Sequence, residues 1–153
     1  PKENREIPPL RYEWVYRLKR DFPTLTIVLN GGVTRDEEIS THLGSVDGVM
    51  VGREAYHNPW SLSDWDARFF AAPQAAASRD GVEEAMVAYM TSEAERAGVP
   101  WAHIARHMLG LRNGQAGARR WRQTWSDHRL KLLPAADVHA RAAGHALSML
   151  GTS

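Results

Sequence analysis

TIVLNGGVT, at residues 26–34, and VDGVMVGREAYHNPW, at residues 46–60, are the two stretches that decide the fold of the first half of the chain. The short apolar runs at residues 25–29 and 46–51 are rich in β-branched side chains, which is typical of strands buried on both faces of a parallel sheet. Each run ends in a turn that contains glycine. We therefore expect two strands whose carboxyl ends are followed by glycine turns.

Helices are predicted before and between these strands. A Pro-Pro pair at residues 8–9 and apolar residues at helical spacing over residues 10–22 indicate a helix that the next proline ends. TRDEEISTHL, at residues 34–43, predicts a second helix, with Thr34 as the N-cap, Glu37 three residues later and acids in the first turn. Alternation of helices and strands in this order is typical of an α/β fold with a parallel sheet.

The second half of the chain has a different pattern. AAPQAAASRDG, at residues 71–81, is small, polar and interrupted by Pro and Gly, as in a linker. Beyond it the apolar residues recur at helical spacing, and no strand is predicted after residue 51. We therefore expect an α/β domain at residues 1–70, a linker at 71–81 and a small helical bundle at 82–153.

Charge is unevenly distributed along the chain, although the net charge is only +1. Residues 101–133 hold seven Lys or Arg and one acid, whereas the other residues are net acidic. This asymmetry indicates a surface that faces a polyanion, and a solvated basic helix face is the alternative. Trp121 and Trp125, one helical turn apart in this segment, are expected to lie in the core rather than to stack on bases.

Composition excludes several kinds of site. The absence of Cys excludes disulfides, thiolate metal sites and a cysteine nucleophile within this chain. No apolar run approaches the roughly 20 residues that a membrane span needs, and no basic-then-apolar leader is present, so neither membrane insertion nor secretion is predicted. His103 and His107 have the i, i+4 spacing of a metal pair, but no third ligand is evident, so we expect surface or tRNA-facing histidines and no metal site.

The two glycine turns have the chemistry of an anion site. Asn30, Gly31 and Gly32 follow the first predicted strand, and Gly52 and Arg53 follow the second. Glycine lets backbone N–H groups approach a phosphate, a helix N-terminus adds further N–H groups, and arginine supplies a charged fork. Adjacent parallel strands end at one sheet edge, and in (β/α)8 barrels the loops after the last two strands bind phosphate. We therefore expect both turns to hold one phosphate; a plain Asn-Gly hairpin turn is the alternative.

Four motifs follow one another over nearly the whole chain: PPLRYEWVYRLKRDFP, LNGGV, VDGVMVGREAYHNPW and HMLGLRNGQAGARRWRQTWS. Together they resemble the C-terminal half of the tRNA-dihydrouridine synthase family, in its A-type subfamily. Members of that family are flavoenzymes with an FMN-binding (β/α)8 TIM barrel and a helical domain that holds tRNA. They are oxidoreductases that use NADPH to reduce the C5–C6 double bond of D-loop uridines.

The resemblance implies a fold and a cofactor site for this chain. The fold would be the last two βα units of a (β/α)8 TIM barrel followed by a small helical bundle. The FMN phosphate would be bound by the same residues that are predicted above to form an anion site: Asn30, Gly31, Gly32, Gly52 and Arg53.

The resemblance also implies four tRNA contacts. Lys2 and Arg5 match family positions on the barrel side, and Arg119 and Arg122 match the arginines of the helical domain that orient the tRNA. Arg120 is a lesser candidate because the alignment could slip by one position there. The expected partners are therefore tRNA and FMN, and the expected location is the cytoplasm.

One family feature is absent from the chain. The catalytic cysteine of the family, which protonates the uracil ring, belongs to the barrel portion that precedes the matching region, as do the contacts to the flavin ring. Because the chain has no Cys, we expect no catalytic residue within it and we expect it to need the N-terminal barrel portion of the same protein. Two other functions stay open: another phosphate-binding barrel enzyme, with a sugar phosphate as ligand, and a non-catalytic RNA-binding helical module.

Overall fold

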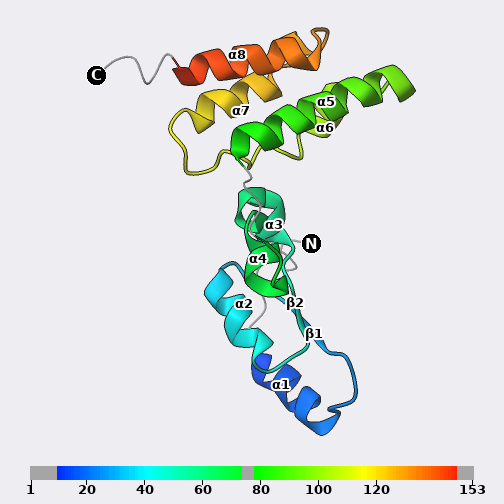
Figure 1. Cartoon of the computed structure of the whole chain (residues 1–153), viewed down its shortest axis with the longest axis vertical. Helices are drawn as coiled ribbons and strands as arrows, with labels where there is room; N and C mark the ends of the chain where they lie inside the picture. The colour runs from blue at the N-terminus through cyan, green and yellow to red at the C-terminus, as the bar shows by residue number, and fades with distance from the viewer. Residues whose placement is uncertain (1–9, 74–77, 148–153) are drawn as a thin grey trace. The chain divides into compact units, whose positions relative to one another are not determined.

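The computed structural model of the chain describes residues 10–73 and 78–147, which belong to two compact units. The N-terminal unit ends at Glu54 and the C-terminal unit begins at Ala55. Figure 1 shows the elements of both, and each unit is described by itself below.

The N-terminal unit is a strand–helix–strand arrangement preceded by one helix. Its elements are α1 (Tyr12–Asp21), β1 (Val28–Asn30), α2 (Asp36–Leu43) and β2 (Gly48–Met50). The two strands pair in parallel, with Val28 opposite Gly48 and Asn30 opposite Met50. Parallel neighbours need a crossover connection, which α2 provides. The predicted order of strand, helix and parallel strand is confirmed.

The start of α2 differs in detail from the prediction. The helix begins at Asp36 with Arg35 as the N-cap. Glu38, the third residue of the helix, accepts hydrogen bonds from the backbone N–H groups of Thr34 at 2.9 Å and of Arg35 at 3.1 Å. The predicted cap by Thr34 with Glu37 is therefore wrong, because the carboxylate that can reach back to the N-cap is the one at the third helical position.

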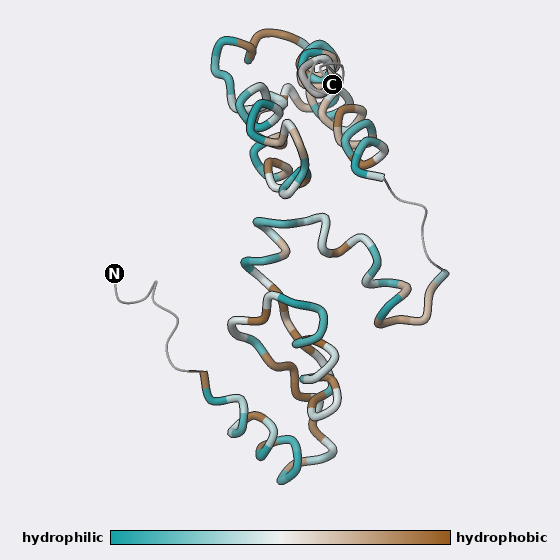
Figure 2. Tube along the Cα trace, turned by 90° about the vertical axis from the view of Figure 1, so that its left-hand side faces the viewer, coloured by the Kyte–Doolittle hydropathy of each residue, from teal (hydrophilic) through white to brown (hydrophobic). Residues whose placement is uncertain are grey.

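The strands are less buried than predicted. Leu29 is buried, whereas its neighbour Val28 is 56% exposed and Met50 of the paired strand is also exposed. Figure 2 shows how apolar residues recur along this part of the chain. The prediction of strands buried on both faces is wrong for this chain, because the described residues cover only one face of the two-stranded sheet. Besides Leu29, the buried apolar residues of the N-terminal unit are Val33, Ile39 and Val46.

Asp47 ties the start of the sheet to α1. Its Oδ2 accepts a hydrogen bond from the Ile27 backbone N–H at 2.8 Å and pairs with Lys19 Nζ at 2.7 Å. Lys19 also donates to the backbone carbonyls of Leu25 at 2.8 Å and Pro23 at 3.0 Å. One lysine of α1 therefore holds both the loop before β1 and the residue before β2.

The described part of the C-terminal unit is helical throughout. After Met50 the described residues contain no strand, as predicted. Helix α5 contacts α6 and α8, and α7 packs on α8 (Figure 1). Over the ranges that the structure describes, no helix is long and apolar enough to cross a bilayer. The elements are α3 (Arg53–His57, which begins in the N-terminal unit), η2 (Pro59–Leu62), α4 (Trp65–Phe70), α5 (Arg79–Ala97), α6 (Trp101–Ala105), α7 (Ala118–Ser126), η3 (His128–Leu130) and α8 (Ala135–Leu147).

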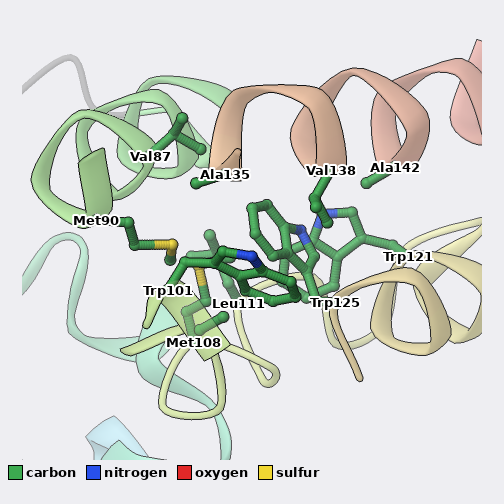
Figure 3. Packing of buried hydrophobic residues seen from close by; sticks show 11 residues of the cluster. Val87, Met90, Trp101, Met108, Leu111, Trp121, Trp125, Ala135, Val138 and Ala142 are labelled. Carbon is green, nitrogen blue, oxygen red and sulfur yellow. The ribbon is translucent and has the colours of Figure 1, made fainter. Parts of the chain in front are cut away.

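Three tryptophans form the centre of the core of this unit (Figure 3). Trp121 and Trp125 are each 2% exposed, so their predicted place in the core is confirmed. The ring of Trp125 meets Trp101 edge to face, with centroids 5.6 Å apart, and Trp101 Nε1 donates to the Leu133 carbonyl at 3.0 Å. The other core residues are Val87, Met90, Ala105, Met108, Leu111, Ala135, Val138 and Ala142.

The segment after the second strand packs with the helices. Trp60 lies against the tryptophan core, and the Arg79 guanidinium lies 4.6 Å from the Trp60 ring centroid. Helix α5 already begins at Arg79, inside the segment expected as a linker at 71–81. Residues 55–70, which the sequence placed with the α/β domain, therefore belong to the C-terminal compact unit. The domain limits at residues 70 and 82 stay a prediction.

Candidate functional site

The two glycine turns leave the same edge of the sheet. Because β1 and β2 are parallel and Asn30 lies opposite Met50, residues 31–32 follow one strand end and residues 52–53 follow its neighbour. The expected meeting of the two turns at the carboxyl edge is therefore confirmed. The crossover through α2 produces it, because a parallel pair brings equivalent ends together.

The backbone of the first turn requires glycine. Gly31 has φ +140° and Gly32 has φ +66°, a region that residues with a side chain rarely adopt. A Cβ at Gly32 would also lie 2.5 Å from Leu10 Cδ1. Tyr12 Oη fixes the turn by donating to the Gly31 carbonyl at 2.7 Å. Leu10 Cδ1 is the end of a flexible, partly exposed side chain that can move, so the positive φ angles are the stronger reason for glycine here.

The second turn carries a free arginine. Arg53 is exposed, and no residue of the described ranges pairs with its guanidinium. Among the described residues, a Cβ at Gly52 would meet only Met50 Sδ, at an ordinary contact distance of 3.6 Å, and Gly52 itself is exposed. Asn30, at the neighbouring strand end, is exposed as well. An unpaired guanidinium beside two glycine turns can bind a phosphate through charge-assisted hydrogen bonds.

Helix α2 does not add donors at this edge in the way that a free helix N-terminus would. The N–H groups of Thr34 and Arg35 donate to the Glu38 carboxylate, which already places a negative charge there. The candidate anion site therefore consists of the two glycine turns and Arg53.

Arg119 and Arg122 share α7 but have different surroundings. Arg119 is exposed, and the described residues offer its side chain no partner. Arg122 is half-buried, and its Nη1 donates to Asn113 Oδ1 at 2.7 Å. Asn113 Nδ2 in turn donates to the His57 backbone carbonyl at 2.7 Å. Arg119 is therefore free for a ligand, whereas Arg122 ties the loop before α7 to the end of α3.

A buried carboxylate holds α7 in place. Glu83 of α5 is 1% exposed, and its Oε1 accepts from Trp121 Nε1 at 2.7 Å and from Trp125 Nε1 at 3.1 Å. Its Oε2 accepts from Arg112 Nε at 2.9 Å and Nη2 at 2.6 Å. Arg112 also pairs with Asp80. Counting Arg112 among the cations that face a polyanion is therefore wrong, because carboxylates of its own unit occupy its guanidinium.

Burial and hydrogen bonding act in opposite directions on Arg112. Burial of the guanidinium acts to lower its pKa, but hydrogen bonds to Glu83 and Asp80 outweigh that effect and raise the pKa above its ordinary value. The arginine therefore stays charged and compensates the carboxylate of Glu83. A buried carboxylate without such a partner would be strongly destabilising.

The remaining candidates contribute less. Lys2 and Arg5 lie outside the described residues. His103 and His107 are exposed, and His107 Nδ1 lies 3.0 Å from the hydroxyl of Tyr56. No group of three metal-ligating side chains occurs within residues 10–73 and 78–147.

Sequence reasoning missed Glu83 and Arg141. Glu83 reads as an exposed acid beside Glu84, although it shares a helix face with Val87 and Met90 at i+4 and i+7, and this spacing could have shown that it is buried. Arg141 is on α8, outside the basic segment that the charge count singled out. It is one of the arginines around a pocket beside α7.

A parallel strand pair with two glycine turns at one edge, followed by a helical unit with exposed arginines, defines an α/β protein with a candidate phosphate site and a basic helical part. Comparison with known families gives a more specific result. The family model described as dihydrouridine synthase (Dus) matches residues 1–143. The chain belongs to the dihydrouridine synthase family.

Three curated relatives are similar to most of this chain. It is 51% identical over 128 residues to a tRNA-dihydrouridine(20/20a) synthase of Shewanella oneidensis, covering 84% of this chain and 38% of that protein. The corresponding enzyme of Pseudomonas putida is 46% identical over 142 residues, covering 93% and 39%. That of Escherichia coli K12 is 47% identical over 150 residues, covering 98% and 42%. The chain thus spans about two fifths of the length of these relatives, and the resemblance seen in its motifs is confirmed.

Proposed function

We propose that the protein to which this chain belongs reduces uridines of tRNA to dihydrouridine, with FMN as its cofactor and NADPH as its reductant. Within it, this chain holds the FMN phosphate and docks tRNA. Family membership supports the activity. The observation that carries the role of this chain is the parallel register of β1 and β2, which brings both glycine turns and the unpaired Arg53 to one sheet edge.

The residues at this edge fit the phosphate of FMN. A phosphate monoester carries up to two negative charges, and Arg53 is an exposed cation with no partner among the described residues. Gly52 and Asn30 are both exposed, which leaves them accessible to the phosphate oxygens. When bound, FMN supplies the hydride that reduces the C5–C6 bond. Arg53 neutralises the phosphate and the turns at residues 31–32 and 52 fix its position, so that the flavin is held at one place.

We assign the proton that completes the reduction to another part of the protein. The chain has no Cys, and by its resemblance to the family the cysteine proton donor belongs to a preceding portion of the barrel. The two parallel strands would then be the last two strands of a (β/α)8 TIM barrel, and its other strands would cover Val28 and Met50, which are exposed here.

Docking of tRNA is assigned to the helical unit. Arg119 is exposed on α7, and the Glu83 network fixes the helix that carries it. We assign further contacts to Lys2 and Arg5, and to the guanidinium N–H groups of Arg122 that do not donate to Asn113. We place the protein in the cytoplasm. A uridine has to leave the base stack to reach a flavin, so firm docking of the tRNA body decides which uridine is presented.

The test uses the full-length protein. It should purify with a flavin absorbance band and convert an unmodified tRNA transcript to a dihydrouridine-containing product in the presence of NADPH, detected by mass spectrometry of the nucleosides. A colourless protein that binds a sugar phosphate would instead support another barrel enzyme. A protein that binds tRNA but neither FMN nor NADPH would support a non-catalytic RNA-binding module.

A further inference from the structure

An arginine-lined pocket lies among α7, η3 and α8. Three arginines line it, Arg120, Arg129 and Arg141, together with Asp127. Its volume is about 490 Å³, which is ample for a phosphate group. The basic side chains come from three different elements, so the pocket is a product of packing and not of one basic stretch.

Only one of the three cations at this pocket has a counter-ion. Arg129 donates to Asp127 through Nε, at 3.0 and 3.1 Å to the two carboxylate oxygens, and through Nη2 at 2.8 Å. Arg120 and Arg141 are exposed, and no described side chain pairs with either of them. Like charges around one pocket repel each other, and a bound anion would relieve that repulsion.

The pocket continues a surface that already contains Arg119. A neighbouring pocket of about 510 Å³ is lined by Arg119, Arg120 and Gln123, and the last two residues also line the first pocket. Successive residues of a helix are rotated by about 100°. Arg120 therefore lies on the flank of α7 opposite to Arg122, which is bound to Asn113. The free cations thus run from Arg119 across α7 towards α8.

We propose that Arg120 and Arg141, assisted by Arg129, bind a phosphodiester group of the tRNA backbone in this pocket. The RNA then crosses from Arg119 on α7 onto α8, on the side of α7 away from Arg122. This inference rests on the proposed function, since it names a contact of the same substrate. The phosphate backbone is the occupant because guanidinium forks match phosphate oxygens, and three such groups against one carboxylate leave an excess of positive charge.

The experiment measures tRNA affinity of the full-length protein between 50 and 200 mM salt. Arg120→Gln and Arg141→Gln should each weaken binding. Together they should reduce the slope of log K against log salt by about 0.7 to 0.9, the loss expected for one phosphate contact. Arg141→Lys, which keeps the charge, should retain most of the slope. Arg96→Gln is the matched control, because Arg96 is an exposed arginine of α5 paired only with Glu93; it should change neither quantity.

Asp127→Asn tests the pocket in the opposite direction. It removes the charge of the one acid among the described residues that line the pocket, with little change of side-chain size, so Arg129 loses its counter-ion. We expect tighter tRNA binding and a steeper salt dependence. Unchanged or weaker binding by a folded Asp127→Asn protein, shown by an unaltered circular dichroism spectrum, would contradict the proposal.

Arg119→Ala separates this inference from the proposed function. If Arg119→Ala weakens binding while Arg120→Gln and Arg141→Gln behave like Arg96→Gln, the RNA does not enter the pocket and the inference is overturned, although tRNA docking by α7 stands. If the wild-type protein does not bind tRNA at all, the proposed function and the inference fall together.

Discussion

Arg112 and Glu83 form a buried ion pair in which Nε and Nη2 of the arginine donate to one carboxylate oxygen, at 2.9 and 2.6 Å. The other oxygen accepts from the indoles of Trp121 and Trp125. A buried charge is tolerated only when it is paired and hydrogen-bonded, so all four bonds are needed together. They tie α7, and with it Arg119, to α5.

Glu83→Ala should strongly destabilise the C-terminal unit. It leaves a guanidinium and two indole N–H groups without their acceptor, and removing one partner of a buried pair costs about 3–5 kcal/mol. The measurement is urea denaturation of the full-length protein followed by tryptophan fluorescence. Glu84→Ala is the control, because Glu84 is the exposed neighbour on the same helix; its effect should stay within about 0.5 kcal/mol. Equal effects of the two variants would show that the buried network does not stabilise the unit.

Gly110→Ala should loosen the contact between the loop before α7 and the end of α3. A Cβ at Gly110 would meet the His57 carbonyl oxygen at 2.0 Å and Pro59 Cδ at 2.9 Å, so backbone has to move. Overpacking of this kind costs about 1–3 kcal/mol, measured as a lower denaturation midpoint. Gly144→Ala on α8, where nothing lies within 4 Å, should instead stabilise by about 0.5–1 kcal/mol. A neutral Gly110→Ala would mean that the loop and the segment are not packed as described.

The stability contributed by Glu38 should depend on pH in the acid range. Hydrogen bonds from the Thr34 N–H, and then from Arg35, lower the pKa of Glu38 from its ordinary value of 4.5 to about 2. Since the folded-state pKa is the lower one, this stabilisation is fully present above about pH 4.5 and is lost as the pH falls towards 2. Wild type and Glu38→Gln should therefore differ in unfolding free energy most at pH 6 and least near pH 2. A difference that does not vary with pH would exclude the capping role of the carboxylate.

Arg53→Ala should weaken FMN binding by about 10- to 100-fold, because a hydrogen bond to a charged group contributes about 1.5–3 kcal/mol. Fluorescence titration of the full-length apoprotein with FMN measures this. Arg20→Ala, which removes an exposed arginine from α1, is the control and should leave FMN affinity unchanged. Equal affinity of the Arg53→Ala and Arg20→Ala proteins would remove Arg53 from the proposed phosphate site.

The elements and the meeting of the two turns could be predicted because they depend on local patterns. β-branched runs at residues 25–29 and 46–51 indicate strands, and the helical segment between them makes the strands parallel. Parallel strands bring residues 31–32 and residues 52–53 to the same edge of the sheet. Likewise, Trp121 and Trp125 are one helical turn apart, and their predicted place in the core is confirmed.

The partners of charged residues could not be predicted, because they lie far apart in the chain. Glu83 and Glu84 are identical in type and adjacent, yet only Glu83 is buried, since its donors follow 29, 38 and 42 residues later. Charge counting treated Arg112 and Arg119 alike for the same reason, although one is internal and the other exposed.

By itself, the sequence determined the order of helices and strands, the two glycine turns and the excess of arginine in residues 101–133. Only the tertiary structure decided which arginines are available to a ligand. Carboxylates of its own unit hold Arg112, and Arg122 gives one N–H to Asn113, whereas Arg119, Arg120 and Arg141 are exposed. The physical reason is that a charged group is buried only where packing brings hydrogen-bonding partners to it, and periodicity along a helix does not specify those partners.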